Sequence, residues 1–329
     1  MLSLICVTLA SAIGAASCPL PDPRAGLALD YADMKGFVLN AADPQFNQFA
    51  PVILVEHFGT EYNRIGTPAA RLDDKGEEDI YVDPAAPTYY LQRVEWTGDH
   101  GKYTNLIYRT HFQMSKGNSN STDGGKGLNV GMLTIVTLNE QGKPVWINTV
   151  GTCGCFHAIL PTNFLPTEVY PSVWDKEERK VYGEKLSGQL RYPEDYDANV
   201  RPVIFLRDGS HRVADMQVAS IASVQEKYEV LDAKEAPIED LRHLPLGTGE
   251  TSFYFEEGPL KGLVKGAIKK RESFIIGAFI GDTRAGQDRI YGPVQELPRG
   301  FYTTINPVQK DGSDMWDYKS FLQHNGWHP

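Results

Sequence analysis

The sequence predicts a mainly β protein, with a minor α+β contribution, in which one antiparallel, sandwich-like domain ends in a short C-terminal helix. Hydrophobic runs of strand length recur from residue 51 onward, and clusters of Gly, Pro, Asn and Asp separate them. No internal repeat and no change in composition marks a second domain after residue 50. We therefore predict a single β-rich domain over residues 51–329, preceded by a tether and an irregular start of the fold over residues 18–50.

The clearest local structure is a hairpin over residues 132–150. Residues 132–138, MLTIVTL, are rich in β-branched and aliphatic side chains, which suit a buried strand. The next six residues, NEQGKP, supply turn chemistry, because Gly142 is free to take positive φ and Pro144 has a fixed φ. Residues 145–150 are predicted to form the second strand of the hairpin.

Further strands are predicted on both sides of this hairpin. Before it they cover residues 51–55, 89–96 and 104–112, and after it residues 185–192, 202–206, 212–218, 251–256 and 273–280. A polar, Gly-rich connection joins the strand at 104–112 to the hairpin, so these consecutive strands are expected to be neighbours in the sheet. Helices are predicted at residues 175–180 and 261–270, and the C-terminal helix is expected to run from a Ser313 cap to about Gln323.

The N-terminal sequence predicts that the protein is exported. Residues 1–17 are predicted to be a signal peptide, because residues 2–17 are uncharged and apolar, too short for a comfortable membrane span, and end in small residues before Cys18. The sequence Ala15-Ala-Ser-Cys18 resembles the cleavage box of bacterial lipoproteins, although Ala15 stands where that box usually has Leu. We expect a periplasmic protein, an outer-membrane lipoprotein or an extracellular protein, and the alternative is a buried N-terminal helix.

The charge balance excludes two classes of partner. The 32 Lys and Arg against 42 Asp and Glu give a formal net charge of -10 and a pI of about 5.3. General attraction to nucleic acid or to anionic lipid is therefore not expected. Membrane attachment is expected only through a lipid on Cys18, and the partner is either an unknown envelope protein or a small ligand.

One cluster of side chains suits a soft metal ion. Cys153, Cys155 and His157 alternate along the chain, so in an extended segment all three side chains point the same way. His111, on the strand expected beside the hairpin, is a candidate fourth ligand, and His57 or water are alternatives. Thiolate and imidazole suit both zinc and copper. The sequence therefore predicts a zinc or copper site at Cys153, Cys155, His157 and His111.

Three other interpretations of the two cysteines stay open. Cysteine is often buried, so both can be core residues of a β protein that binds a ligand or a partner without catalysis. They can also form a strained short-loop disulfide that takes part in thiol redox chemistry. One thiolate can act as the nucleophile of an enzyme if an imidazole lowers its pKa. The sequence contains no complete catalytic motif of another kind that would decide among these functions.

Overall fold

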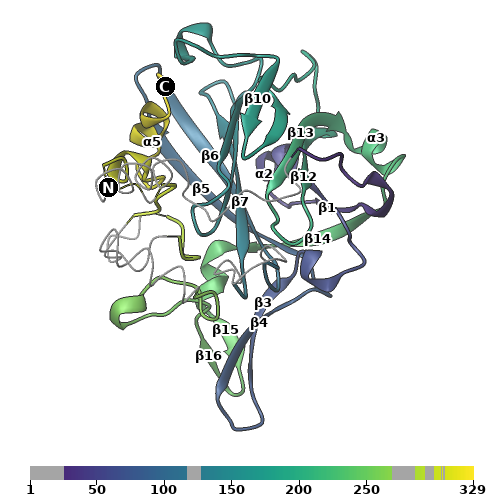
Figure 1. Ribbon diagram of the computed structural model, residues 1–329, viewed down its shortest axis with the longest axis vertical. Coiled ribbons are helices and arrows are strands. Elements are labelled where there is room, and N and C mark those ends of the chain that lie inside the picture. The colour runs from purple at the N-terminus through teal and green to yellow at the C-terminus, as the bar shows by residue number, and fades with distance from the viewer. Residues whose placement is uncertain (1–25, 117–126, 269–285, 293–299, 305, 307) are drawn as a thin grey trace, which may run out of the picture.

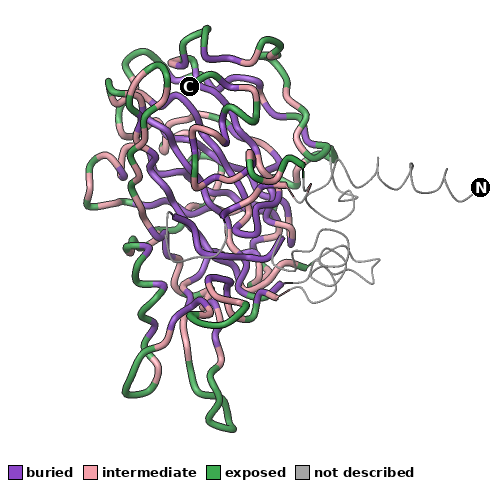
Figure 2. The backbone as a smooth tube through the Cα atoms, turned by 90° about the vertical axis from the view of Figure 1, so that its left-hand side faces the viewer, coloured by how far each residue is buried: buried purple, intermediate pink, exposed green. Residues whose placement is uncertain are grey.

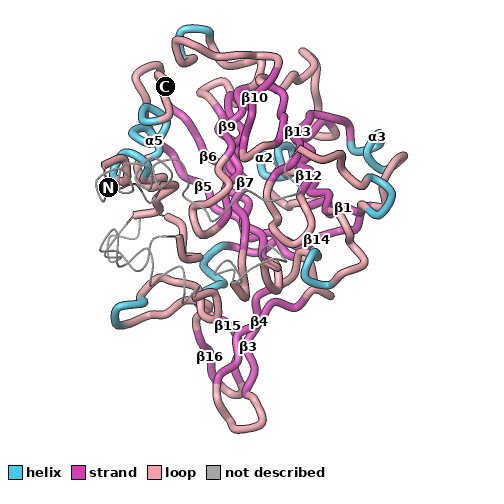
Figure 3. The backbone as a smooth tube through the Cα atoms, viewed as in Figure 1, coloured by secondary structure: helices cyan, strands magenta, loops and turns pink. Residues whose placement is uncertain are grey.

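The structure, a computed structural model, describes residues 26–116, 127–268, 286–292, 300–304, 306 and 308–329. The predicted signal peptide and the strand predicted at residues 273–280 lie outside the described residues. Strands dominate the described part of the chain, and its helices are short (Figure 1 and Figure 3). The predicted class, a mainly β single domain with a short C-terminal helix, is confirmed.

Ten strands form one large sheet. They are β1 (Lys35–Leu39), β2 (Val52–Val55), β5 (Thr88–Thr97), β6 (Lys102–His111), β7 (Gly131–Leu138), β8 (Pro144–Gly151), β9 (Ala158–Pro161), β12 (Val200–Leu206), β13 (Val213–Ser220) and β14 (Val230–Pro237). Their order across the sheet is β13-β12-β2-β1-β14-β5-β6-β7-β8-β9. Neighbours from β5 to β9 are antiparallel, and β6 lies beside β7 as predicted. The other half contains parallel pairs, β1 with β14, β14 with β5 and β2 with β12, so the sheet is mixed.

In the described part of the chain, three two-stranded hairpins lie outside this sheet. They are β3 (Thr67–Leu72) with β4 (Glu78–Asp83), β10 (Glu178–Val181) with β11 (Glu184–Ser187), and β15 (Leu244–Leu246) with β16 (Gly249–Thr251). The β3–β4 and β15–β16 hairpins project from the body of the molecule (Figure 1). Figure 2 shows that the tips of these projections are exposed, whereas the strands in the body are buried. The short helices are α2 (Pro44–Phe49), α3 (Ile221–Gln225), α5 (Tyr318–His324), and the 3-10 turns η1 (Tyr31–Asp33), η2 (Glu61–Asn63), η3 (Thr167–Val169), η4 (Ile238–Arg242), η5 (Gly258–Leu260) and η6 (Asp311–Ser313).

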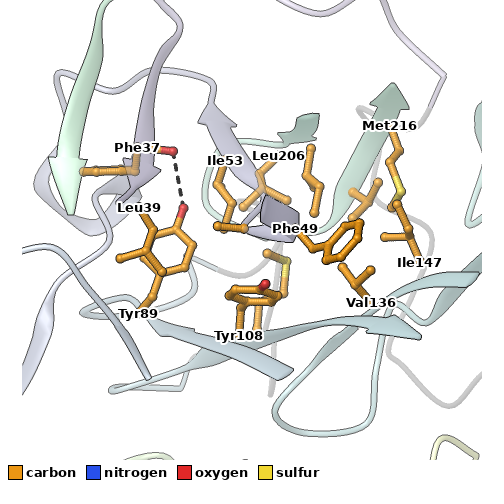
Figure 4. Close-up of a cluster of buried hydrophobic side chains, with 14 of the residues drawn as sticks. Phe37, Leu39, Phe49, Ile53, Tyr89, Tyr108, Val136, Ile147, Leu206 and Met216 are labelled. Atoms are coloured by element: carbon orange, nitrogen blue, oxygen red, sulfur yellow. Dashed lines mark hydrogen bonds between the residues drawn. The ribbon is translucent and has the colours of Figure 1, made fainter. Parts of the chain in front are cut away.

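The large sheet curls around a hydrophobic core. Tyr108 of β6, Ile147 of β8 and Met216 of β13 are far apart in the strand order, yet their side chains meet around Phe49 (Figure 4). Phe49 lies on α2, and the hydroxyl of Tyr108 donates to the carbonyl of Phe46 on the same helix at 2.8 Å. The curl therefore gives strands from both halves of the sheet one common interior.

The fold begins earlier than predicted. Residues 35–49, expected to be irregular, form β1 and α2, and Phe37 and Phe49 are each 1% exposed. The apolar run in β1 is only three residues long, and α2 is only six, so neither repeats long enough to show a period. Asp43 nevertheless caps α2, because its side chain accepts from the backbone N–H groups of Gln45 and Phe46.

Three helix predictions need correction. In the segment predicted as a helix at 175–180, β10 pairs with β11, because cross-strand pairing outweighs the helix propensity of its charged side chains. Residues 261–268 form turns, in which Gly262 and Gly266 take positive φ. The C-terminal helix begins at Tyr318 with Asp317 as its cap, whereas Ser313 lies in η6. Among the described residues, no helix has the length and apolar character needed to cross a membrane.

Candidate functional site: a ring of loops on the curled sheet

Six loop segments form a closed chain of contacts, which we call the loop ring. They follow or precede strands of the large sheet and of the β10–β11 hairpin, so the sheet fixes where each one starts. They comprise residues 56–66, 111–116, 129–131, 151–157, 182–184 and 207–212.

Side chains join one half of the ring. The amide of Asn63 donates to Asp208 Oδ1 at 2.8 Å and so ties the loop after β2 to the turn after β12. From that turn, Arg212 Nη1 donates to the carbonyl of Tyr182 at 3.3 Å. The ring of Tyr182 meets the edge of Phe156, with centroids 5.4 Å apart, and this contact reaches the loop after β8.

Backbone groups join the other half. The N–H of Thr152 donates to the carbonyl of Gly131 at 2.8 Å, which connects the loop after β8 to the start of β7. The imidazole Nδ1 of His111 lies 3.3 Å from the carbonyl of Asn129. The N–H of Gly66 donates to the carbonyl of His111 at 2.9 Å and closes the ring back to the loop that contains Asn63.

Backbone strain is concentrated in the loop ring. Every non-glycine residue with positive φ among the described residues belongs to it: His57, Asn129, Phe156, Tyr182 and His211, at φ between 50° and 56°. Each such residue costs about 1–3 kcal/mol, and strained residues of this kind gather at functional sites, where the surrounding structure holds them in place. The ring is therefore the first candidate for the functional surface.

A histidine lies between two aspartates in the ring. His57 Nδ1 is 3.2 Å from Asp208 Oδ2, and His57 Nε2 is 3.6 Å from Asp30 Oδ2. The His57 side chain is 41% exposed, whereas that of Asp208 is 14% exposed. Asn63, fully buried, donates to Asp208 Oδ1 and also to the carbonyl of His57 at 3.0 Å. Asn63 thus fixes both members of the His57–Asp208 pair.

Glu56 positions the two aspartates. Its carboxylate is fully buried and accepts from the backbone N–H of Asp30 at 3.0 Å and from the backbone N–H of Asp208 at 3.2 Å. It also accepts from Arg207 Nη1 at 3.0 Å. Because Glu56 directly precedes His57, one carboxylate sets the position of the chain on both sides of the imidazole.

A buried ion network supports this arrangement. Glu184 accepts from Arg207 Nε and Nη2, both at 2.9 Å, and forms an ion pair with Arg212 Nη2 at 2.7 Å. Burial raises the pKa of Glu184, but the bond from Arg207 and the charge of Arg212 outweigh it, so the pKa lies below its usual value. With Glu56 the network contains two carboxylates and two guanidinium groups, whose side chains are all at most 3% exposed. Its charges therefore balance.

His111 is held as a neutral imidazole. Its Nε2 accepts from Arg109 Nε at 2.8 Å, so the proton of the ring lies on Nδ1, which faces the carbonyl of Asn129. Burial, together with the charge of Arg109, lowers the pKa of His111 well below its usual value. Both ring nitrogens are therefore engaged with protein groups.

His211 serves as a flat buried surface. Its ring stacks on Phe112 with centroids 3.9 Å apart and an interplanar angle of 4°. Burial lowers the pKa of His211 to about 4, so the imidazole is neutral at physiological pH. The stack links the loop after β6 to the turn that contains Asp208.

The Cys153 to His157 segment is a turn and not an extended strand. Gly154 and Phe156 have φ of 84° and 56°, and the N–H of Gly151 donates to the carbonyl of Cys155 at 2.8 Å. The alternation that would place three ligands on one face is therefore absent. Cys153 is buried and takes no part in a disulfide, whereas Cys155 is disulfide-bonded. The two cysteines are thus not bonded to each other.

The predicted metal ligands His157 and His111 lie in different surroundings. His157 packs its ring against Phe321 of α5, with centroids 5.0 Å apart, and burial lowers the pKa of His157 to about 3. His111 is engaged as described above. Within the described ranges, no group of three or more His, Cys, Asp or Glu side chains is arranged to hold a metal ion. A zinc or copper site at Cys153, Cys155, His157 and His111 stays a prediction, without support from this geometry.

Sequence reasoning missed most of the His57 site. In the sequence His57 stands out only as an alternative metal ligand, and Asp208 follows a predicted strand without any catalytic motif. Their contact joins two chain segments that are distant in the sequence, as the separation of 145 positions between Asn63 and Asp208 shows. No local pattern encodes a contact of that range.

Comparison of the chain with protein-family models, curated proteins and solved structures finds no match.

Proposed function

We propose that the protein is an exported acid–base enzyme that acts on a small ligand at the loop ring, with His57 as its general base. The observation that carries this proposal is the His57–Asp208 pair. A half-exposed imidazole in a strained backbone conformation faces a mostly buried carboxylate, and buried Asn63 fixes the other oxygen of that carboxylate.

The roles follow from the two ring nitrogens. Asp208 at Nδ1 favours the tautomer with its proton on that nitrogen and stabilises the imidazolium that forms during catalysis. Nε2 is then the basic atom, and it accepts a proton from a water molecule or from a substrate hydroxyl. Asp30, near Nε2 at 3.6 Å, adds negative charge beside the imidazolium. The reaction class is hydrolysis by activated water or proton abstraction from the substrate.

The disulfide of Cys155 supports the expected compartment. Disulfides persist in oxidising environments, which agrees with export. A lipid on Cys18 and a choice among periplasm, outer membrane and extracellular space remain predictions.

The test compares two histidines that both face a carboxylate. Wild-type protein, His57→Gln and His243→Gln are assayed on a panel of ester, amide, phosphoester and glycoside substrates. His243 lies 2.8 Å from Glu250, but both side chains are more than 60% exposed and lie outside the loop ring. We expect His57→Gln to lower kcat/KM by about 10²- to 10⁴-fold and His243→Gln to leave it unchanged.

Two results would count against this function. Activity that survives His57→Gln would remove His57 from the reaction. If the wild type turned over no substrate but bound a ligand at the ring, the protein would be a binding module without catalysis, which is the competing hypothesis.

A further inference from the structure

Arg109 is a buried cation with an unused donor. It is fully buried on β6, where Nε donates to His111 Nε2 at 2.8 Å and Nη1 donates to the carbonyl of Arg289 at 3.0 Å. Nη2 is buried and has no hydrogen-bond partner among the described residues. A buried charged donor left without a partner costs more than a neutral one, for which the penalty is about 1–3 kcal/mol.

Two other buried arginines, Arg201 and Arg207, lack this defect. Arg201, also without a carboxylate, donates from all three nitrogens, to the carbonyls of Ala198 and Leu39 and to the side chain of Asn47. Arg207 is bonded to two carboxylates. Burial lowers the pKa of Arg207, but the two carboxylates outweigh burial and raise this pKa above its usual value. For Arg109 the balance is the reverse, because burial lowers its pKa more than Tyr254, Asp288 and Tyr90 raise it.

A second unpartnered donor lies beside Arg109. The guanidinium carbon is 5.5 Å from the centre of the Tyr254 ring, and Tyr254 is 3% exposed. Its hydroxyl is buried and has no hydrogen-bond partner within the described ranges. Tyr254 belongs to the segment that places Phe253 against the ring of His111, with centroids 4.7 Å apart. The two donors therefore belong to one buried cluster on the outer side of β6.

We propose that Arg109 Nη2 and the Tyr254 hydroxyl form a binding site for a small oxyanion, distinct from the His57 site. Two donors, one of them cationic, select an acceptor that carries negative charge. Nε and Nη1 of Arg109 already donate to protein groups. Arg109 can therefore bind one oxygen atom of the ligand and cannot form the bidentate pair of hydrogen bonds that an exposed arginine makes. The shared chemistry is that of a carboxylate, phosphate or sulfate group.

Asp288 sets a limit on the charge of the ligand. Its carboxylate accepts from the hydroxyl of Thr152, and its charge acts on Arg109. Repulsion from Asp288 favours an ion with a single charge over a strongly charged one. The expected ligand is therefore a monoanionic oxyanion.

The test measures thermal unfolding of the full chain with phosphate, sulfate or acetate, against chloride at equal ionic strength. Because the protein passes through its unfolded state, a buried site is open to the ion before refolding. Binding to the folded state raises Tm in proportion to the logarithm of anion concentration. Tyr254→Phe removes one donor without changing charge and should weaken the apparent affinity roughly tenfold.

Matched variants separate the site from general salt effects. Tyr192→Phe removes another buried hydroxyl without a partner among the described residues, and should leave the anion response unchanged. Arg109→Lys keeps the charge but loses the planar group, and it should abolish the anion response. This variant replaces Tyr254→Phe as the test if Tyr254→Phe does not fold. A response to acetate identifies a carboxylate ligand, a response to phosphate alone identifies a tetrahedral one, and a response to sulfate alone contradicts the single charge expected from Asp288. The proposal is overturned if no oxyanion raises Tm above chloride, or if Tyr254→Phe and Arg109→Lys respond like the wild type.

Discussion

Glu184→Gln should be one of the most destabilising conservative substitutions in this chain. Glu184 accepts two bonds from Arg207 at 2.9 Å and one from the backbone N–H of Gly26 at 3.0 Å, and it forms an ion pair with Arg212 at 2.7 Å. Glutamine keeps the shape but removes the charge, which leaves the network with two guanidinium groups and only the carboxylate of Glu56. Breaking a buried ion pair from one side costs about 3–5 kcal/mol, and this is the expected loss in free energy of unfolding.

The matched control lies on the same hairpin. Glu178→Gln removes an ion pair with Lys185 at 3.2 Å, in which the side chains are 43% and 67% exposed. An exposed pair of this kind contributes about 0–1 kcal/mol. Urea denaturation at neutral pH should show a large fall in midpoint for Glu184→Gln, with an unchanged m-value, and almost none for Glu178→Gln. Equal midpoints for the two variants would refute the idea that the network is buried and coupled.

The same network predicts a pH dependence. The pKa of Glu184 is lower in the folded protein than its usual value of 4.5, so its contribution is fully present above about pH 4.5. As the pH falls through the folded pKa, the carboxylate is protonated and the contribution is lost. The difference in stability between wild type and Glu184→Gln should therefore shrink in acid, and a difference that stays constant down to pH 3 would contradict this account.

Three further predictions test the loops and their histidines. Gly142→Ala, at φ 68° with open space around it, should lower the free energy of unfolding by roughly 1–2 kcal/mol from backbone strain alone. Gly154→Ala should lower it clearly more, because its Cβ would clash with the carbonyl oxygen of Tyr302. Equal urea midpoints for the two variants would contradict that contact. In an NMR titration the imidazole of His157 should stay neutral to near pH 3 and that of His211 to near pH 4; since both pKa values are lowered, stability should fall as the pH drops below about 6.5, and midpoints near 6.5 would show that these rings are exposed. Cys153 should react with a thiol reagent only after unfolding, because it is 9% exposed, so rapid labelling of the folded protein would be the contrary result.

The β hairpin of β7 and β8 was predictable because its signal is local. Consecutive β-branched residues and a Gly-Lys-Pro turn lie within one window of the sequence. β14 could not be predicted in this way, because its sequence VLDAKEAP has three charged residues and no clear alternation. It is a strand because β1 and β5 pair with it, one along each half of its length. Such tertiary pairing outweighs weak β propensity.

The candidate site was predictable only in its single residues. Cys153, Cys155 and His157 stand out by type, but Gly154 and Phe156 bend the chain and remove the alternation that would have joined them. The His57 site depends instead on two buried residues of ordinary appearance, Glu56 and Asn63, that bind segments distant in sequence. Asp208 faces His57 because β2 and β12 pair in parallel and bring the ends of both strands together, and that pairing has no signature in a local window.

A crystallographic fragment screen tests most directly whether the loop ring is the functional surface. Crystals of the full chain are soaked with a library of small polar fragments, and the bound positions are counted over the whole molecule. Our account predicts that fragments gather at the ring, with acceptor or hydroxyl oxygens at about 3 Å from His57 Nε2. Fragments that bind elsewhere and leave His57, Asp208 and Asp30 in contact only with solvent would contradict it.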